Sequence, residues 1–261
     1  MAEPLIFVTN DDGIEAEGLH VLERVAARYG RVMTVAPKNE MSGISHALTL
    51  HAPLRVHEHS AGRWSVTGTP ADCVYLGINH MATERPALAL SGVNHGPNLG
   101  YDVIYSGTLA GAREAVIQGV PAIAFSLTGR RPYDFEGAVV ALDAVVREAL
   151  TRGIPEDTLL NVNIPPPQAG HRGFLSTSLG IRHYSGDVER RVDPRGGEYV
   201  WIGGKHITYR DIPGSDCNAV RDGWVSVTAL QLDTTHWGAK ATLDGWGLFT
   251  PAHAARPSVG A

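Results

Sequence analysis

Residues 5–13, with the sequence LIFVTNDDG, decide how the first part of the chain folds. Four apolar residues lead into a polar turn that ends in glycine, a pattern typical of a buried strand followed by a tight turn. Beyond the turn, Leu19, Leu22, Ala26 and Tyr29 recur at helical spacing until Gly30 ends the repeat. The stretch therefore predicts a strand, a polar turn and an amphipathic helix, in that order.

The same alternation continues to residue 165. Short apolar strands are expected at residues 32–36, 64–67, 88–90, 122–125 and 159–164. One of the intervening helices is expected to begin after Thr69 as N-cap, with Pro70 at its first position and Asp72 completing a capping box. Because the strands are apolar on both faces, they predict an α/β fold with a mostly parallel sheet covered by helices on both sides.

The character of the sequence changes after the core. We expect one domain overall, with an α/β core over residues 1–170 that carries the functional site. Residues 171–233 contain β-rich runs between clusters of Gly, Asp and Arg, which predicts an antiparallel extension used for oligomerisation. Residues 234–261 are expected to form a weakly ordered C-terminal tail.

Composition limits the class of protein. Hydrophobic residues make up 43% of the 261 residues, and the longest apolar runs are far too short to cross a bilayer. The N-terminus lacks a signal-peptide pattern, so a cytoplasmic protein without a membrane partner is expected. A net charge of −5 argues against a nucleic-acid polymer as partner. Cys73 and Cys217 are expected to be buried free thiols, with a disulfide as the alternative.

Three polar segments, residues 10–13, 38–43 and 91–98, each follow a predicted strand. Parallel strands end at one edge of a sheet, so these segments are expected to converge there. Adjacent carboxylates at Asp11 and Asp12 repel each other, and a cation relieves that repulsion. With neutral oxygens from Ser42 and Asn94, they form a donor set suited to Mg²⁺ or Mn²⁺. The alternative is structural: Asp11 caps the next helix and Asp12 shapes the turn with Gly13.

Residues 105–108, Tyr-Ser-Gly-Thr, directly precede a predicted helix. Backbone N–H groups and the hydroxyls of Ser106 and Thr108 could cradle a phosphate there, with Gly107 allowing close approach. An ordinary helix N-cap is the alternative. The sequence has no dinucleotide-binding, P-loop or serine-hydrolase motif. His46 and His95 lie close to the site in sequence, but each is expected to be solvent-facing or satisfied in the core.

In their order along the chain, these motifs resemble the SurE survival protein family of 5′/3′-nucleotidases, also described as stationary-phase acid phosphatases. The motifs are at residues 9–13, at 36–37 with 42–43, at 68–73, at 91–100 and at 105–108. The resemblance implies a Rossmann-like core and a C-terminal extension exchanged between subunits of a homodimer or homotetramer. It also implies activity on nucleoside 5′- and 3′-monophosphates and short polyphosphate, with one divalent metal ion per subunit.

The resemblance also assigns roles to individual residues. It implies metal ligation by Asp11, Asp12, Ser42 and Asn94. It implies phosphate binding by Asn98, Ser106, Gly107 and Thr108. Trp224 stands where the family commonly has Tyr.

Metal-assisted hydrolysis of a phosphomonoester is the mechanism that these assignments favour. Asp12 is the candidate base, and an aspartyl-phosphate intermediate on one of the paired acids, Asp11 or Asp12, is the competing mechanism. A non-catalytic nucleotide-binding module is the rival function. A phospho-signalling receiver domain also places paired acids after its first strand. It needs a later acceptor Asp, however, where this chain has Asn94.

Overall fold

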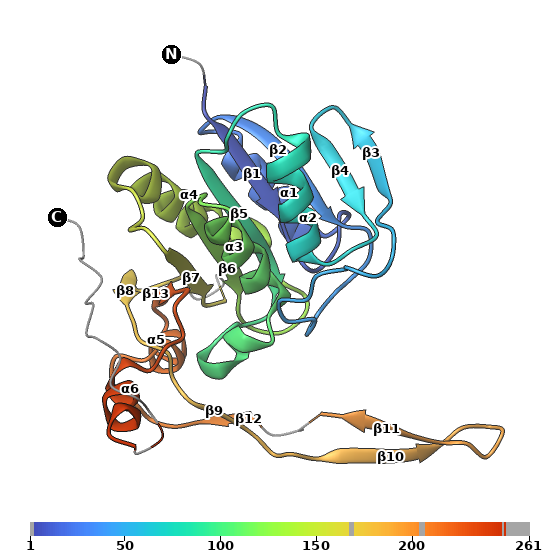
Figure 1. Ribbon diagram of the computed structural model, residues 1–261, viewed down its shortest axis with the longest axis vertical. Helices are drawn as coiled ribbons and strands as arrows, with labels where there is room; N and C mark the ends of the chain where they lie inside the picture. The colour runs from blue at the N-terminus through green and yellow to red at the C-terminus, as the bar shows by residue number, and fades with distance from the viewer. Residues whose placement is uncertain (1–2, 167–169, 204–206, 247, 249–261) are drawn as a thin grey trace.

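The computed structural model describes residues 3–166, 170–203, 207–246 and 248. Its centre is a nine-stranded sheet in the order β3-β4-β2-β1-β5-β6-β7-β13-β8 (Figure 1). Six of the eight strand pairings are parallel and two are antiparallel, which confirms the predicted mostly parallel α/β sheet. The strands are β1 (Leu5–Thr9), β2 (Arg31–Pro37), β3 (Val56–Ser60), β4 (Arg63–Val66), β5 (Leu88–His95), β6 (Ala122–Leu127), β7 (Thr158–Ile164), β8 (Phe174–Ser176) and β13 (Val225–Gln231).

Helices cover both faces of this sheet. α1 (Glu17–Ala26) and α4 (Phe135–Arg152) pack together on one face, and α2 (Pro70–Leu76) and α3 (Gly107–Ile117) pack together on the other. Strand β1 is apolar throughout because it is buried on both faces. Ile6 and Val8 belong to the core under α1 and α4, whereas Leu5 and Phe7 belong to the core under α2 and α3. Alternating side chains thus serve two cores.

Local signals set the helix starts. Thr69 caps α2 in a capping box with Asp72, and Pro70 occupies the first turn, as predicted. Ser106 caps α3 by accepting a hydrogen bond from the backbone N–H of Leu109 at 3.1 Å. Asp134 caps α4 in the same way. These caps satisfy N–H groups that a helix leaves unpaired at its first turn.

The strand order reverses beside β1. From β1 the chain moves to β2 and β4 on one side, and then returns to β5 on the other side. The carboxyl ends of β1 and β5 therefore diverge into loops at a topological switch point, where open α/β sheets bind ligands. The predicted convergence of residues 10–13, 38–43 and 91–98 is confirmed. Thr9 and Ser91 are paired neighbours, and the backbone N–H of Met41 donates to the carbonyl of Asp11 at 2.7 Å.

The C-terminal third divides between the sheet and an arm. Two strands from beyond residue 170, β8 and β13, belong to the central sheet, where β13 runs antiparallel to β7. A short ribbon of β9 (Arg182–Tyr184) and β12 (Ile207–Tyr209) leads to the hairpin of β10 (Val188–Val192) and β11 (Glu198–Ile202). This arm projects away from the body (Figure 1). The remaining short elements are η1 (Gly77–Met81), η2 (Gly100–Ile104) and α5 (Asp216–Arg221).

The prediction of a weakly ordered tail from residue 234 is wrong for its first part, because α6 (Trp237–Asp244) forms there. His236 caps this helix by accepting from the N–H of Ala239 at 2.9 Å, and Asp233 accepts from the indole of Trp237. These local hydrogen bonds stabilise a helix that buries none of its residues. Residues 247 and 249–261 of the predicted tail lie outside the described residues.

The structure also bears on the cysteines and on membrane-spanning helices. Cys73 and Cys217 are free and buried, as expected. Among the described residues, no helix combines the length and apolar character needed to span a membrane.

Candidate functional site

The carboxyl ends of β1 and β5 open into a hollow of about 380 Å³. Five of the residues predicted to form the site line it together: Asp11, Ser42, Asn94, Asn98 and Ser106. The other three, Asp12, Gly107 and Thr108, are not among its lining residues. The hollow has a further wall from the C-terminal part of the chain, made by Arg182, Tyr184 and Ile207.

Asp11 lies at the N-terminus of α3. The hydroxyl of Thr108 donates to its Oδ1 at 2.6 Å, and the side chain is almost fully buried. Gly107 makes this approach possible, since a Cβ there would lie 2.9 Å from the carboxylate Oδ2. Burial, followed by the charge of Asp12, raises the pKa of Asp11 to about 7. Helix dipole and hydrogen bonds oppose that shift without cancelling it.

This arrangement decides against the structural alternative for the paired acids. α1 has Ala16 as its N-cap, with no side-chain cap hydrogen bond, so Asp11 does not cap that helix. The turn is held instead by Asn10, whose amide donates to the carbonyl of Gly13 at 2.9 Å and accepts from its N–H at 3.3 Å. The structure therefore gives neither carboxylate the capping or turn-shaping part that the alternative assigned to it.

Asp12 is anchored by one residue, His95. The backbone N–H of His95 donates to Oδ2 at 3.2 Å, and the imidazole Nδ1 lies 3.2 Å from Oδ1. Burial is the main cause that raises the pKa of Asp12 to about 6. Burial, with the charge of Arg131, lowers the pKa of His95. The buried Nε2 of His95 has no hydrogen-bond partner among the described residues, so we assign the neutral tautomer with the proton on Nδ1.

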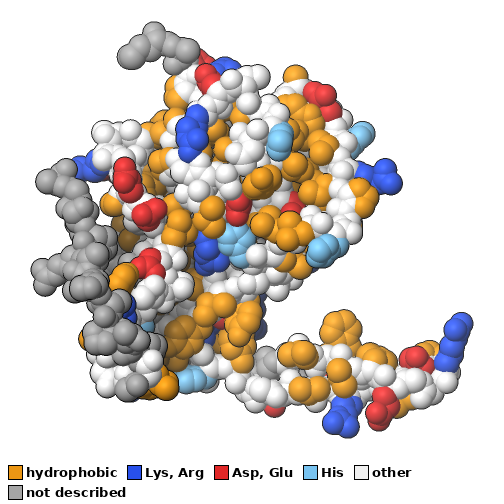
Figure 2. Space-filling view, in the orientation of Figure 1, with side chains coloured by type: hydrophobic (Ala, Val, Ile, Leu, Met, Phe, Trp, Pro, Cys, Tyr) orange, Lys and Arg blue, Asp and Glu red, His pale blue; other side chains and the backbone are white. Residues whose placement is uncertain are grey.

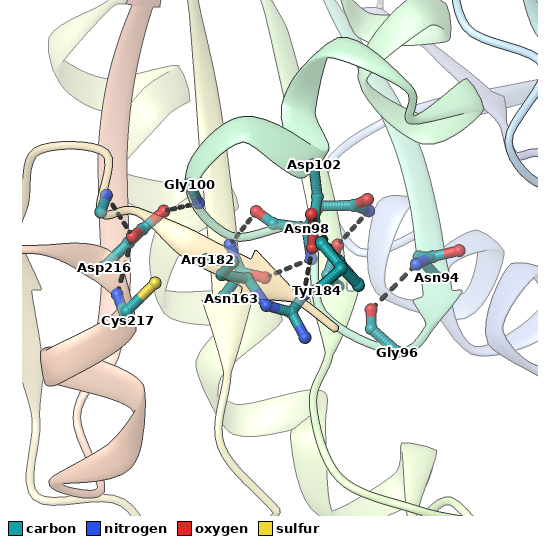
Figure 3. A network of polar contacts seen from close by, with 12 residues as sticks. Asn94, Gly96, Asn98, Gly100, Asp102, Asn163, Arg182, Tyr184, Asp216 and Cys217 are labelled. Atoms are coloured by element: carbon teal, nitrogen blue, oxygen red, sulfur yellow. Dashed lines mark hydrogen bonds and ion pairs between the residues drawn. The ribbon is translucent and has the colours of Figure 1, made fainter. Parts of the chain in front are cut away.

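The two neutral oxygen donors come from different elements. Asn94 lies near the carboxyl end of strand β5, which changes register between Ser91 and Asn94, and its side chain lines the hollow. The amide nitrogen of Asn94 donates to the carbonyl of Gly96 at 2.8 Å, which leaves its oxygen as a donor for a cation (Figure 3). Ser42 lies on the exposed loop after β2, where its hydroxyl donates to Glu40 at 2.9 Å.

Asn98 is held by a buried amide network (Figure 3). Asn163 accepts from its backbone N–H at 2.8 Å, and the amides of Asn161 and Asn163 both donate to its carbonyl. Its own amide nitrogen donates to Ser126 at 2.8 Å. The network fixes Asn98 at the floor of the hollow, with strand β7 behind it. Such a buried network is stable only because each polar group finds a partner.

Comparison with known proteins decides the family. A family model described as "Survival protein SurE" matches residues 6–186. The 5′-nucleotidase SurE of Geobacter sulfurreducens is 47% identical over 98% of this chain and 97% of its own length. That of Myxococcus xanthus is 48% identical over 92% of both chains. The crystal structure of the SurE protein from Aquifex aeolicus superposes with a TM-score of 0.81, at 39% identity, over 92% of this chain and 98% of its own.

This chain belongs to the SurE family. The family resemblance and the α/β fold expected from the sequence are thereby confirmed.

The donor set of this SurE family member fits a hard divalent cation. Within the described residues, neither Asp11 nor Asp12 is paired with a lysine or arginine, and His95 is neutral as assigned. Two buried carboxylates whose pKa values are raised in this way gain stability from a bound cation. No group of three or more His, Cys, Asp or Glu side chains that could hold a metal gathers anywhere in the described chain, so this site offers only two carboxylates. The neutral oxygens of Asn94 and Ser42 would complete the set.

Two features of the site in this SurE chain were not predicted from its sequence. One is the contact of His95 with Asp12. The other is Asp102, which pairs with Arg182 and accepts from the hydroxyl of Tyr184 at 2.5 Å (Figure 3). Burial, followed by this hydrogen bond, raises the pKa of Tyr184 to about 12, so the phenol stays protonated and donates. The partners are about 80 residues apart in sequence, and no local pattern links them.

Proposed function

We propose that this chain hydrolyses nucleoside 5′-monophosphates to nucleoside and inorganic phosphate, with a divalent cation held by Asp11, Asp12, Ser42 and Asn94. The chain is a 5′-nucleotidase, in agreement with the names of its curated relatives. The observation that carries the proposal is a pair of adjacent acids at the switch point of the sheet: Asp11, which is buried and lines the hollow, and Asp12, whose side chain is largely covered. Mg²⁺ and Mn²⁺ are the cations that suit these oxygens best.

When bound there, the cation supplies positive charge that polarises a phosphate oxygen and acidifies water. The residues of the chain orient the two acids. Thr108 and Gly107 hold the carboxylate of Asp11 at the N-terminus of α3, where one rotamer is fixed by the 2.6 Å hydrogen bond. His95 holds both oxygens of Asp12 in one orientation. Pre-organised acids lose little freedom when the substrate arrives.

Asp12 is our candidate for the general base. A carboxylate with a pKa near 6 is ionised at neutral pH, yet it accepts a proton more readily than an exposed aspartate. Attack by one of the paired acids, Asp11 or Asp12, on phosphorus, with an aspartyl-phosphate intermediate, is the competing route.

Asn98 and Ser106 line the hollow beside Asp11 and are our first choice for the phosphate contacts. The hydroxyl of Ser106 accepts from Leu109 and still has a proton to donate. Thr108 is fully buried and already donates to Asp11, so its predicted phosphate contact, like that of Gly107, stays a prediction. Donors at the end of a helix are well placed to stabilise phosphate charge.

A wider substrate range is part of the proposal. The family resemblance favours nucleoside 3′-monophosphates and short polyphosphate as further substrates. A non-catalytic nucleotide-binding module is the alternative function, since the same loops would hold phosphate without cleaving it.

Phosphate release from a panel of nucleoside 5′- and 3′-monophosphates tests the proposal, with Mn²⁺, with Mg²⁺ and with EDTA. We expect release that needs the cation and that Asp11→Asn abolishes. Asp143→Asn is the control, because Asp143 lies on α4 and pairs with Arg28 at 2.9 Å. Folded protein that binds nucleotide but releases no phosphate with any ion would establish the binding module instead.

The arm supports a homodimer or homotetramer. Six large apolar side chains of its hairpin are exposed: Val188, Val192, Tyr199, Val200, Trp201 and Ile202. Hydrophobic side chains are seen along the arm in Figure 2, well away from the body. Exposed apolar surface of this kind is typical of an interface between chains. Light scattering of the wild type and of Val200→Asp/Trp201→Asp tests this, with a smaller species expected for the variant.

We also retain a cytoplasmic location as a proposal, because both cysteines are free, as expected in a reducing compartment.

A further inference from the structure

The ribbon of β9 and β12 turns one defined face toward the hollow. Its two strands are antiparallel, with Tyr184 opposite Ile207 and His183 opposite Thr208. Residues that are opposite one another share a face, and neighbours along a strand alternate. Arg182, Tyr184 and Ile207 line the hollow, whereas His183 and Thr208 are exposed on the other face.

The face toward the hollow is apolar where it is accessible. Tyr184 is 50% exposed and Ile207 is 49% exposed, although both line a hollow. The guanidinium of Arg182 lies 5.4 Å from the centre of the Tyr184 ring and is largely covered. A ligand in the hollow therefore meets an aromatic ring and an aliphatic side chain on this wall.

Asp102 fixes the wall relative to the catalytic groups. It lies in η2, just before Ser106, and its backbone carbonyl accepts from the N–H groups of Tyr105 and Ser106 at 3.0 and 3.1 Å. Its carboxylate pairs with Arg182 and accepts from Tyr184 (Figure 3). One residue thus links the wall to the loop that carries Ser106. The pairing also neutralises Arg182, so the wall offers no free positive charge for a second phosphate.

We propose that Tyr184 and Ile207 form the nucleoside-binding wall of the site, with the base stacked on the Tyr184 ring and Arg182 and Asp102 as positioning residues. This inference rests on the proposed function, because it takes the phosphate end of the substrate to lie at Asn98 and Ser106. A hollow of about 380 Å³ falls within the usual size of small-molecule pockets. Aromatic side chains stack with every base, so the wall favours nucleosides over simple alcohols as leaving groups.

Steady-state kinetics with adenosine 5′-monophosphate test the wall, with inorganic phosphate as a competitive inhibitor that probes only the phosphate end. We expect Tyr184→Ala to raise KM for the nucleotide about 10-fold, since base stacking is lost. We expect kcat to change little and the inhibition constant of phosphate to stay the same. Tyr184→Phe keeps the ring, and its KM is expected to stay near that of the wild type. His183→Ala, on the opposite face of the same strand, is the matched control.

Three results would overturn the inference: an unchanged KM in Tyr184→Ala, an equal loss in His183→Ala, or an equal rise in the inhibition constant of phosphate. The last would mean that Tyr184 acts through Asp102 on the phosphate end. Wild-type protein that releases no phosphate from the nucleotide would contradict the proposed function instead. In that case, calorimetric binding of the same nucleotide to wild type, Tyr184→Ala and His183→Ala still decides whether the wall binds nucleoside.

Discussion

The imidazole of His95 lies 3.2 Å from Asp12, and the backbone N–H of the same residue lies 3.2 Å from the other carboxylate oxygen. One residue of β5 therefore orients an acid at the end of β1. Tyr133 stacks on the imidazole at 5.5 Å, and Phe135 packs beside it at 5.0 Å, so the ring itself is held in place. Carboxylates oriented by such neighbours are typical of metal and catalytic sites.

Asp12→Asn tests the role of this acid directly. We expect kcat to fall roughly 100-fold or more, because an amide cannot accept the proton of the attacking water. Turnover should be measured at saturating Mn²⁺, with metal binding followed separately by calorimetry. Near-normal turnover of the variant with its metal still bound would exclude Asp12 as the base.

His95→Phe separates orientation from packing, because phenylalanine keeps the stack with Tyr133 and loses Nδ1. We expect kcat to fall about 10-fold with little change in KM, as is usual when a neighbour that orients a ligand is removed. Loss of the Nδ1 donor raises the pKa of Asp12, so the acid limb of the kcat profile should move to higher pH.

A matched control for this variant is His20→Phe, since His20 also contacts a carboxylate, that of Glu23 at 3.3 Å, outside the hollow. We expect its turnover and pH profile to be those of the wild type. An acid limb that does not move in His95→Phe would show that the imidazole only fills space.

The buried charge of Asp11 predicts how stability depends on pH in the metal-free protein. Between the ordinary value of 3.8 and about 7, the folded chain keeps a proton that the unfolded chain has lost. Stability therefore falls as pH rises through this window and is lowest above it. Asp11→Asn removes the buried charge, so it should raise the free energy of unfolding at pH 8 by about 1 to 3 kcal/mol. At pH 5 the gain should be smaller.

Urea unfolding in EDTA at both pH values measures this effect. Asp143→Asn is expected to change stability in the opposite direction, since it breaks the pair with Arg28. Asp11→Asn that is less stable than wild type at pH 8 would contradict the prediction. So would a wild type whose metal-free stability rises between pH 5 and pH 8. Asp11→Asn should also be inactive, so we expect function and stability to conflict at residue 11.

Sequence patterns predicted the parts of the site that depend on topology. Asp11 follows β1 and Asn94 lies near the carboxyl end of β5, and neighbouring parallel strands bring such positions together. The contact of His95 could not be predicted, because it depends on the register shift in β5 after Ser91. The link of Asp102 to Arg182 could not be predicted either, because it depends on how the arm leaves the sheet.

The C-terminal part of the chain shows the same limit. Its β-rich segments were recognised, but the pairing of β13 with β7 was not, since antiparallel addition to a parallel sheet depends on long-range contacts. Helix α6 was missed because it has no buried stripe to reveal it. Its signal was local, in the cap from His236 and in the contact of Asp233 with the indole of Trp237.

The buried carboxylate of Asp72 predicts how the loop that carries Ser42 is held. Asp72 accepts from the backbone N–H and hydroxyl of Thr49, at 2.8 and 2.6 Å, and from the N–H of Thr69 at 2.9 Å. An amide offers one acceptor oxygen where the carboxylate offers two, so Asp72→Asn leaves a buried donor unpaired. We expect a loss of about 1 to 3 kcal/mol in the free energy of unfolding.

The same substitution should also weaken binding of Mn²⁺, because the loop between β2 and β3 becomes less well fixed around Ser42. His46, which contacts Glu114 at 2.8 Å, and Ser45, whose hydroxyl donates to the carbonyl of Ile104 at 2.7 Å, are further anchors of this loop and should limit the loss. Urea unfolding and metal calorimetry give the two readouts, with Glu58→Gln on the exposed strand β3 as control. Stability and metal affinity equal to wild type in Asp72→Asn would show that the loop is held without this carboxylate. Lower stability with unchanged metal affinity would show that Asp72 supports the fold but does not position Ser42.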